Sequence, residues 1–272
     1  MVDELVKYKN ASGVVEISLM RGERHNSLTI EMFEAIADAG RRLASDKSAR
    51  VAILLGEGPS FCAGLDLSVM KQLIGDRQEL KKIKDVLLQK GRGPENLAQR
   101  VATVWGTVPV PVIAVLTGVA FGGGFQIAMG CDIRIAQEQT RFSIMESRYG
   151  LIPDMGITQT LPRLIGYDKA LELTLSAREF GGGEASRLGL VTELSDAPYN
   201  RARELASQIS GRSPDAVRSI KKLFHHSWVS VDSHNLALEA SLQERLLGTS
   251  NQLEAVSAAM ERREPNFSNA VT

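Results

Sequence analysis

The sequence predicts an α/β protein with a helical C-terminal portion. Two observations carry this prediction: strand and helix patterns alternate through the first half of the 272-residue chain, and helical patterns dominate beyond about Asp168. Val15, Ile17 and Leu19 alternate with polar residues, which is typical of a half-buried strand. A chain of this length is also long enough to bury a sizeable core.

The first helix is predicted after the loop RGERHNSL. Thr29 can cap this helix with its side-chain oxygen, and apolar residues then recur at helical spacing. The apolar face carries Met32, Phe33, Ile36 and Leu43. Residues 51–55 form a short apolar run that predicts a buried strand, and this strand ends in the loop GEGPSFCAGLDL.

The alternation continues through the middle of the chain. Residues 110–116 predict a buried strand that leads into three consecutive glycines and a buried helix. Short strands are predicted at residues 133–136 and 141–144. A later helix opens with Ser213 and Pro214, a capping residue followed by proline at the first helical position.

The charge balance argues against nucleic acid as the main partner. Hydrophobic residues make up 43% of the chain and charged residues 24%, which is ordinary for a globular protein. The chain has 32 Lys and Arg residues against 32 Asp and Glu residues, so it has no net field to attract a polyanion. An anionic ligand would have to meet a local basic cluster.

The termini and the apolar runs predict a cytoplasmic protein without a membrane span. The longest apolar run, residues 108–121, contains two prolines and is shorter than the roughly 18 residues that a span needs. The N-terminal stretch MVDELVKYKN has acidic residues where a signal peptide would be basic and then apolar. Cys62 and Cys131 are too few for a disulfide framework, so we expect reduced thiols.

Two glycine-rich loops, FCAGLDL and GVAFGGGFQIAMGCD, lie where a strand ends and a helix begins. Backbone N–H groups at a helix N-terminus have no partner within the helix, and the helix dipole adds partial positive charge there. Two such groups aimed at one point form an oxyanion hole. The alternative interpretation of the glycine run is a tight turn that packs a helix on a sheet. A dinucleotide-binding loop is disfavoured because no acidic residue follows at the expected spacing.

The two loops in this order resemble the crotonase superfamily, the enoyl-CoA hydratases and isomerases. The segments RGERHNSL, LSAREFGGGEASRLGLVTEL and AAMERREPNF extend the resemblance over most of the chain. It implies a crotonase-like spiral of β-β-α units over residues 1–200. A C-terminal helical trimerisation region over residues 201–272 would follow, and the assembly would be a homotrimer or a hexamer.

The resemblance also implies the ligand and the oxyanion donors. The ligand would be an acyl-CoA thioester, with CoA as part of the substrate and no separate cofactor. The backbone N–H groups of Leu65 and Gly123 would hold the thioester oxygen as an enolate develops. Because losing one such donor typically costs about 100- to 1,000-fold in rate, a bare backbone at the triple glycine has a chemical use.

Three residues, Glu146, Asp154 and Gln126, are predicted to be catalytic. Glu146 matches one of the two catalytic glutamates of typical hydratases, whereas Gln126 stands where the other would be, and an amide cannot act as a general base. The spacing of Glu146 and Asp154 resembles the dienoyl-CoA isomerase branch, in which two acids serve opposite ends of a conjugated system. That branch, however, has an aspartate at the position of Gln126.

Double-bond isomerisation is the preferred reaction, with Glu146 as principal base. Hydration of a 2-enoyl-CoA is the alternative within the family, and a non-catalytic acyl-CoA-binding relative is the alternative from another class. Asp154 follows a proline, so capping a helix that begins near Gly156 competes with a catalytic role. Gln126 in a buried helix can also simply bond its amide to the backbone.

The remaining predicted contacts follow from position in the loops. CoA phosphates need Lys or Arg in an otherwise neutral protein. The predicted CoA-binding residues are Arg21, Arg24, Ala63 and Asp66, with Arg262 and Arg263 as further candidates. The predicted acyl pocket comprises Met70, Leu73 and Ile74, which can alternatively fill the core. No metal site is expected, because the adjacent His225 and His226 do not share a helical face.

Overall fold

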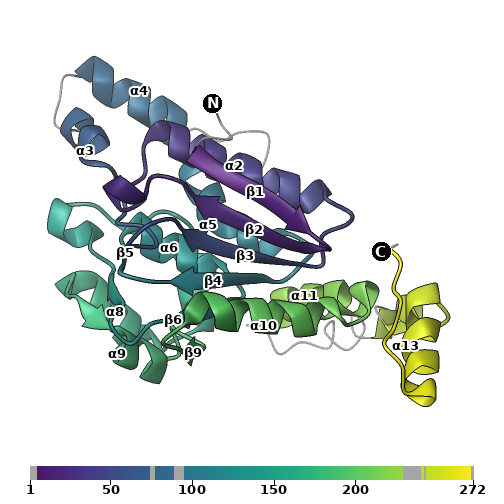
Figure 1. Cartoon of the computed structure of the whole chain (residues 1–272). Coiled ribbons are helices and arrows are strands. Elements are labelled where there is room, and N and C mark those ends of the chain that lie inside the picture. Colours follow the sequence, from purple (N-terminus) through teal and green to yellow (C-terminus); the bar gives the residue numbers. More distant parts are fainter. Residues whose placement is uncertain (1–4, 74–76, 89–94, 229–239, 242, 271–272) are drawn as a thin grey trace.

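The computed structural model describes residues 5–73, 77–88, 95–228, 240–241 and 243–270, and it contains two sheets. The larger has six strands in the order β1-β2-β3-β4-β6-β9, and the smaller has three in the order β5-β7-β8 (Figure 1). The strands are β1 (Val6–Ala11), β2 (Val14–Leu19), β3 (Val51–Gly56), β4 (Val112–Leu116), β5 (Val119–Phe121), β6 (Ile133–Ala136), β7 (Arg141–Ser143), β8 (Phe180–Gly181) and β9 (Glu193–Leu194). The predicted α/β class is confirmed.

Helices and short 3-10 turns connect these strands. The helices are α2 (Ile30–Ser45), α3 (Leu67–Leu73), α4 (Arg77–Leu87), α5 (Leu97–Thr107), α6 (Gly123–Gly130), α7 (Ile157–Thr160), α8 (Tyr167–Ser176), α9 (Gly182–Arg187), α10 (Pro198–Ser210), α11 (Pro214–Ser227) and α13 (Ser250–Glu261). The 3-10 turns are η1 (Gly22–Arg24), η2 (Glu146–Tyr149) and η3 (Leu161–Arg163). The predicted helix after Thr29 is confirmed, and the Thr29 hydroxyl accepts a hydrogen bond from the Met32 amide.

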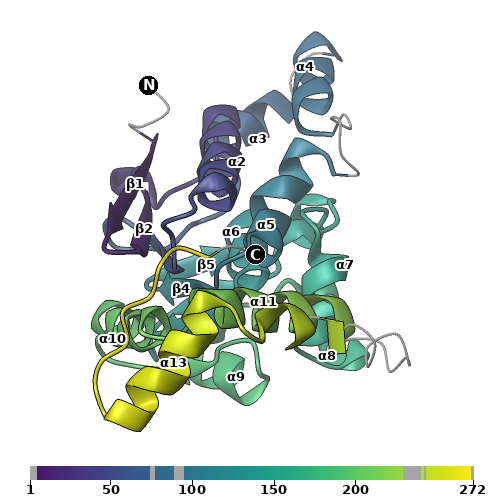
Figure 2. The same ribbon diagram turned by 90° about the vertical axis from the view of Figure 1, so that its right-hand side faces the viewer.

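The large sheet is covered on both faces, so its central strands are apolar on both sides. Strands β2, β3, β4, β6 and β9 run parallel, and β1 pairs antiparallel with β2. Along β3, Ala52 and Leu54 join the main core with α2 and α5, whereas Val51 and Ile53 pack toward α10. Figure 2 shows the sheet between these two helical layers.

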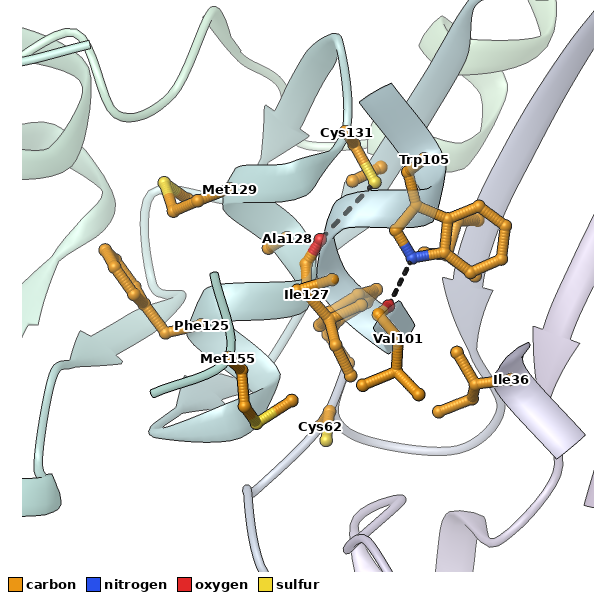
Figure 3. Close-up of a cluster of buried hydrophobic side chains, with 14 of the residues drawn as sticks. Ile36, Cys62, Val101, Trp105, Phe125, Ile127, Ala128, Met129, Cys131 and Met155 are labelled. Atoms are coloured by element: carbon orange, nitrogen blue, oxygen red, sulfur yellow. Dashed lines mark hydrogen bonds between the residues drawn. The ribbon is translucent and has the colours of Figure 1, made fainter. Parts of the chain in front are cut away.

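The main core lies between the sheet and helices α2, α5 and α6. Trp105 is fully buried in it and donates its indole N–H to the Val101 carbonyl at 2.8 Å (Figure 3). All eight residues of α6 are buried, and this helix begins at the triple glycine. The core therefore holds rigidly the helix whose N-terminus belongs to the second glycine-rich loop.

Helix α10 crosses the predicted boundary between residues 200 and 201. Its Ala202 and Ala206 are fully buried and pack with Ile53, Ile113 and Ile135 of the large sheet. This helix thus contributes to the core of the α/β portion. In the described part of the chain, no helix is long and apolar enough to cross a membrane.

Helix α11 starts as predicted, with Ser213 as its capping residue, but it buries a polar side. Lys221 is 9% exposed and its ammonium donates to Asp132 Oδ2 at 2.6 Å. The same ammonium donates to the Trp105 and Val110 carbonyls at 2.7 and 2.9 Å. Asp132 Oδ2 also accepts the Val112 amide. Lys221 therefore fastens α11 to the ends of α5 and α6 and to the start of β4.

The apolar side of α11 faces outward in the isolated chain. Its exposed members are Ile220, Phe224 and Trp228, each more than half exposed. An apolar stripe of this kind is typical of a surface that packs against another chain. The homotrimer or hexamer stays a prediction.

Replacing Lys221 with methionine tests whether this buried ammonium fastens the C-terminal helices. We expect Lys221→Met to lower the free energy of unfolding by about 3 kcal/mol, because it leaves a carboxylate and two buried carbonyls without their donor. Urea unfolding at neutral pH measures the change. Lys222→Met, at the exposed neighbouring position, should stay within about 0.5 kcal/mol of the wild type. Equal losses in the two variants would contradict the assignment.

Candidate active site

The two glycine-rich loops lie side by side. The Cys62 amide donates to the Val119 carbonyl at 3.1 Å, and the Phe121 amide donates to the Cys62 carbonyl at 3.0 Å. These bonds join the loop after β3 to strand β5 of the smaller sheet. They bring Leu65, in the first loop, close to the N-terminus of α6.

A cavity of about 800 Å³ opens between these loops, and it contains most of the predicted site residues. Those that line it are Arg21, Arg24, Ala63, Leu65, Asp66, Met70, Gly123 and Glu146. Gln126 lies behind the cavity wall at 1% exposure, and Asp154 does not line the cavity. The side chain of Leu73 and all of Ile74 lie outside the described residues.

The two predicted oxyanion donors are backbone amides without an assigned partner. Gly123 is the first residue of α6, so its N–H has no carbonyl one turn earlier. The neighbours of Leu65 are paired, since the Leu28 amide bonds to Gly64 and the Asp66 amide bonds to Leu28. Within the described ranges, neither the Leu65 nor the Gly123 amide donates a hydrogen bond. Both residues line the cavity, where the amides can bind an oxygen atom.

Packing explains part of the triple glycine. A Cβ on Gly124 would lie 2.3 Å from the Cys62 carbonyl oxygen, so glycine is needed for α6 to approach the first loop. Gly122 has a φ of +50°, a conformation that side chains disfavour. The tight-turn interpretation therefore accounts for these two glycines, and the Gly123 amide is what the turn presents to the cavity.

The first loop is fixed by a cluster around Asp66. One carboxylate oxygen accepts both terminal nitrogens of Arg21 at 3.1 Å and the Ser27 hydroxyl at 2.6 Å. The other oxygen accepts the Ser68 amide and hydroxyl. Burial alone would raise the pKa of Asp66, but the hydrogen bonds from Ser27, Ser68 and Arg21 hold it well below its usual range. Asp66 is therefore an anion that anchors the residue next to the Leu65 amide.

This cluster changes the interpretation of two predicted CoA contacts. Arg21 and Asp66 bind each other, so Arg21 is not a free cation for a phosphate. Arg24 is exposed at the same cavity. Arg263 forms ion pairs with Glu254 and Glu261 at α13, far from α3 along the molecule (Figure 1).

Sequence reasoning missed several residues of the cavity wall. Lys71, Tyr149 and Leu151 line it, and both apolar residues are exposed, at 51% and 44%. Lys71 is adjacent to Met70, and Tyr149 and Leu151 lie three and five residues after Glu146. Their positions next to predicted site residues were the only sequence signal.

Glu146 presents one carboxylate oxygen with a partner and one without. It begins turn η2, and its Oε1 accepts a hydrogen bond from Gln126 Nε2 at 2.7 Å. Its Oε2 is buried and has no hydrogen-bond partner among the described residues. Desolvation by burial is the main reason that its pKa is raised, and the nearby Asp154 charge adds to it. A buried acid of this kind is suited to accept and return a proton near neutral pH.

Gln126 joins Glu146 to the segment that carries Asp154. Its side-chain oxygen accepts a hydrogen bond from the Met155 amide at 2.9 Å. The side-chain oxygen of Gln126 therefore bonds to the backbone, as the alternative interpretation expected, whereas its side-chain nitrogen bonds to the carboxylate of Glu146.

Asp154 does not cap a helix. Helix α7 begins at Ile157, and its capping position is Gly156, which has no side chain to accept a hydrogen bond. Asp154 is an exposed residue, yet protein atoms surround its carboxyl group closely enough for desolvation to raise its pKa. Asp154 lies outside the lining of the cavity, on the segment that follows Glu146.

Two further features concern a buried thiol and metal binding. Cys62 is fully buried, and burial raises its pKa to about 12, so it packs beneath the loops as a neutral thiol. In the ranges that the structure describes, no group of three or more His, Cys, Asp or Glu side chains is placed to hold a metal ion. Besides carboxyls and backbone amides, the cavity is lined by the polar side chains of Arg24, His25, Lys71 and Tyr149.

Comparison with known proteins identifies the family. The sequence profile of the enoyl-CoA hydratase/isomerase family matches residues 9–270. The chain belongs to this family. The fold agrees: the crystal structure of an enoyl-CoA hydratase from Bacillus anthracis is similar, with a TM-score of 0.85 and 31% identity, over 97% of this chain and 98% of that one. The crotonase fold predicted from the two loops is therefore confirmed.

The relatives of this chain are named for different reactions. A peroxisomal Δ(3,5)-Δ(2,4)-dienoyl-CoA isomerase from Arabidopsis thaliana is 30% identical over 97% of this chain and 96% of its own length. The mitochondrial methylglutaconyl-CoA hydratase of Homo sapiens is 32% identical over 94% of this chain and 74% of its own length. An acyl-CoA substrate is expected for the family, whereas the choice between isomerisation and hydration is left open. The cytoplasmic location stays a prediction, since these two relatives are organellar.

The raised pKa of Glu146 predicts a pH-dependent effect on stability. Below its ordinary pKa of 4.5, the group is protonated in the folded and the unfolded chain alike. As pH rises above 4.5 the unfolded chain releases the proton first, which favours unfolding until the folded pKa is passed. We therefore expect Glu146→Gln to gain stability relative to the wild type as pH rises from 4.5 to 8.

Urea unfolding across this pH range measures the difference between variant and wild type. Glu34→Gln, at an exposed position of α2, is the matched control. A stability difference between Glu146→Gln and the wild type that stays constant over this pH range would show that burial does not oppose the ionisation of Glu146.

Proposed function

We propose that this protein is an enoyl-CoA isomerase that moves a double bond through a thioester enolate. The observation that carries the proposal is the buried Oε2 of Glu146, in a cavity that also presents the amides of Leu65 and Gly123. None of these three groups has a hydrogen-bond partner among the described residues. A base and two oxyanion donors at one cavity are what deprotonation next to a thioester carbonyl requires.

The proposed mechanism has two proton transfers at one carboxylate. The thioester oxygen accepts hydrogen bonds from the Leu65 and Gly123 amides. Glu146 Oε2 removes a proton from the carbon next to the thioester carbonyl, and the electron pair moves onto the thioester oxygen to form an enolate. When electron density returns from the oxygen, a different carbon forms the new C–H bond and the double bond takes its new position. The protonated Glu146 then returns the proton to a different carbon, so that no atom is gained or lost. Its raised pKa makes the neutral intermediate form of the acid accessible.

Asp154 extends the proposal to a conjugated substrate. Asp154 precedes Met155, whose amide bonds to Gln126, and Gln126 also bonds to Glu146. The Asp154 charge raises the pKa of Glu146. With a 3,5-dienoyl-CoA, one acid would remove a proton at one end of the conjugated system and the other acid would deliver one at the far end. The similarity to a dienoyl-CoA isomerase supports this version.

Hydration is the second candidate, favoured by the similarity to methylglutaconyl-CoA hydratase. Water addition needs a group that activates water on one side of the double bond. The residue in contact with Glu146, at 2.7 Å, is an amide, which cannot act as a second general base. The geometry therefore supports isomerisation over hydration.

Product identification tests the proposal. Purified protein is incubated separately with a 2-enoyl-, a 3-enoyl- and a 3,5-dienoyl-CoA, and products are followed by mass and ultraviolet absorbance. We expect products of unchanged mass and shifted absorbance, with a rate about 100- to 10,000-fold lower in Glu146→Gln. Asp154→Asn should slow only the dienoyl substrate. A product one water heavier would establish hydration instead, and binding without turnover would favour a non-catalytic role.

Arg21 and Arg24 should differ in the kinetic constant that they affect. Arg21→Met removes the anchor of Asp66 and lets the Leu65 amide move, so we expect kcat to fall roughly 10- to 100-fold. Arg24→Met removes an exposed cation at the cavity, so we expect KM for the acyl-CoA to rise while kcat is unchanged. Steady-state kinetics measure both. An Arg21→Met variant with raised KM and normal kcat would restore its predicted role in CoA binding.

A further inference from the structure

Gln126 is a buried polar side chain that connects the segments carrying the two acids of the site. It lies in α6, three residues after Gly123, and is 1% exposed. Its nitrogen contacts Glu146 and its oxygen contacts the backbone of Met155, the residue after Asp154. It is thus bonded to one acid and to the chain segment of the other.

We propose that Gln126 is a positioning residue that fixes both acids relative to α6 and commits the site to proton transfer rather than water addition. The inference rests on the proposed isomerase function. Gln126 has no proton-transfer role of its own, since an amide neither accepts nor releases a proton near neutral pH.

The orientation of the amide is determined by its neighbours. The Met155 backbone N–H is a donor only, so it must face the side-chain oxygen of Gln126. The nitrogen must then face Glu146 Oε1, which accepts. Neither partner tolerates the reversed amide as long as Glu146 is ionised. The Gln126 side chain is therefore held in one orientation by two bonds of 2.9 and 2.7 Å.

This orientation selects the oxygen that reacts. Glu146 Oε1 is occupied by Gln126, and a Cβ added to Gly122 would lie only 3.4 Å from it, so this oxygen lies against the glycine turn. Oε2 is left as the atom that can take a proton. With a substrate that has a single double bond, the same oxygen removes the proton and returns it, as a shift of the double bond on one face of the substrate requires.

The segment with Asp154 is fixed to the same helix by a second contact. The Met155 side chain is 5% exposed and its sulfur would lie 2.9 Å from a Cβ on Gly123. Figure 3 shows Met155 at the buried cluster with Ile127 of α6. Met155 is thus fixed through its side chain at Gly123 and through its amide at Gln126. Asp154, one residue before it, is carried on an anchored segment.

Two substitutions separate the two parts of the inference. Gln126→Met has a similar shape and removes both hydrogen bonds. Because the Gln126 bond lowers the pKa of Glu146, its loss should raise that pKa and move the acid limb of the kcat/KM profile to higher pH. We expect kcat to fall about tenfold with KM changed less than about twofold.

Gln126→Glu places a second carboxyl group 2.7 Å from Glu146, where the two must share one proton. The ionised member can activate water, so we expect a product one water heavier from a 2-enoyl-CoA, at least about tenfold above the wild-type level. Gln159→Met, at an exposed position of α7, should change neither the pH profile nor the products. Calorimetric titration with a saturated acyl-CoA verifies that each variant is folded and binds.

The outcomes separate this inference from the proposed function. A wild-type enzyme that adds water would overturn both. A wild-type isomerase whose Gln126→Met variant keeps its pH profile, and whose Gln126→Glu variant forms no water adduct, would overturn the role of Gln126 alone.

Discussion

The contact between the N-terminus of α6 and the loop after β3 determines the geometry of the site. At Gly124 the two backbones approach so closely that a Cβ would lie 2.3 Å from the Cys62 carbonyl oxygen. The two unpaired amides, of Leu65 and Gly123, come from these two segments. Their separation is therefore set by backbone packed on backbone, which side-chain motion cannot change. Preorganised donors of this kind need no rearrangement when charge develops on a bound oxygen.

The charges around this contact have opposite roles. Asp66 is stabilised as an anion by Arg21, Ser27 and Ser68, and it fixes the first loop. Glu146 is destabilised as an anion because burial removes it from water and, among the described residues, only its Oε1 has a hydrogen-bond partner. The fold thus satisfies fully the carboxylate that holds structure and leaves incomplete the carboxylate proposed to react. Incomplete solvation of this kind lowers stability and is typical of functional sites.

Much of the fold and the loop pair could be predicted from the sequence because their signals are local. The Thr29 cap, the alternation along β2 and the strand-to-helix turns each depend on a few consecutive residues. The pairing of Arg21 with Asp66 joins residues 45 positions apart, so no local pattern indicates it. The Pro-Asp signal at Asp154 left helix capping open as an alternative to catalysis, but Gly156, with its φ of +79°, occupies the capping position. On α11, periodicity identifies the apolar face without saying whether this chain covers it.

Helix α6 has one end at the site and the other at the C-terminal helices. Its first residue presents the Gly123 amide, and just beyond its last residue Asp132 binds Lys221 of α11. Eight residues of α-helix span about 12 Å, and a buried helix of this length does not bend appreciably. It therefore behaves as a short strut between the cavity and the C-terminal part of the chain. A displacement of α11 would therefore also move, one helix length away, the Gly123 amide that is proposed to bind the thioester oxygen.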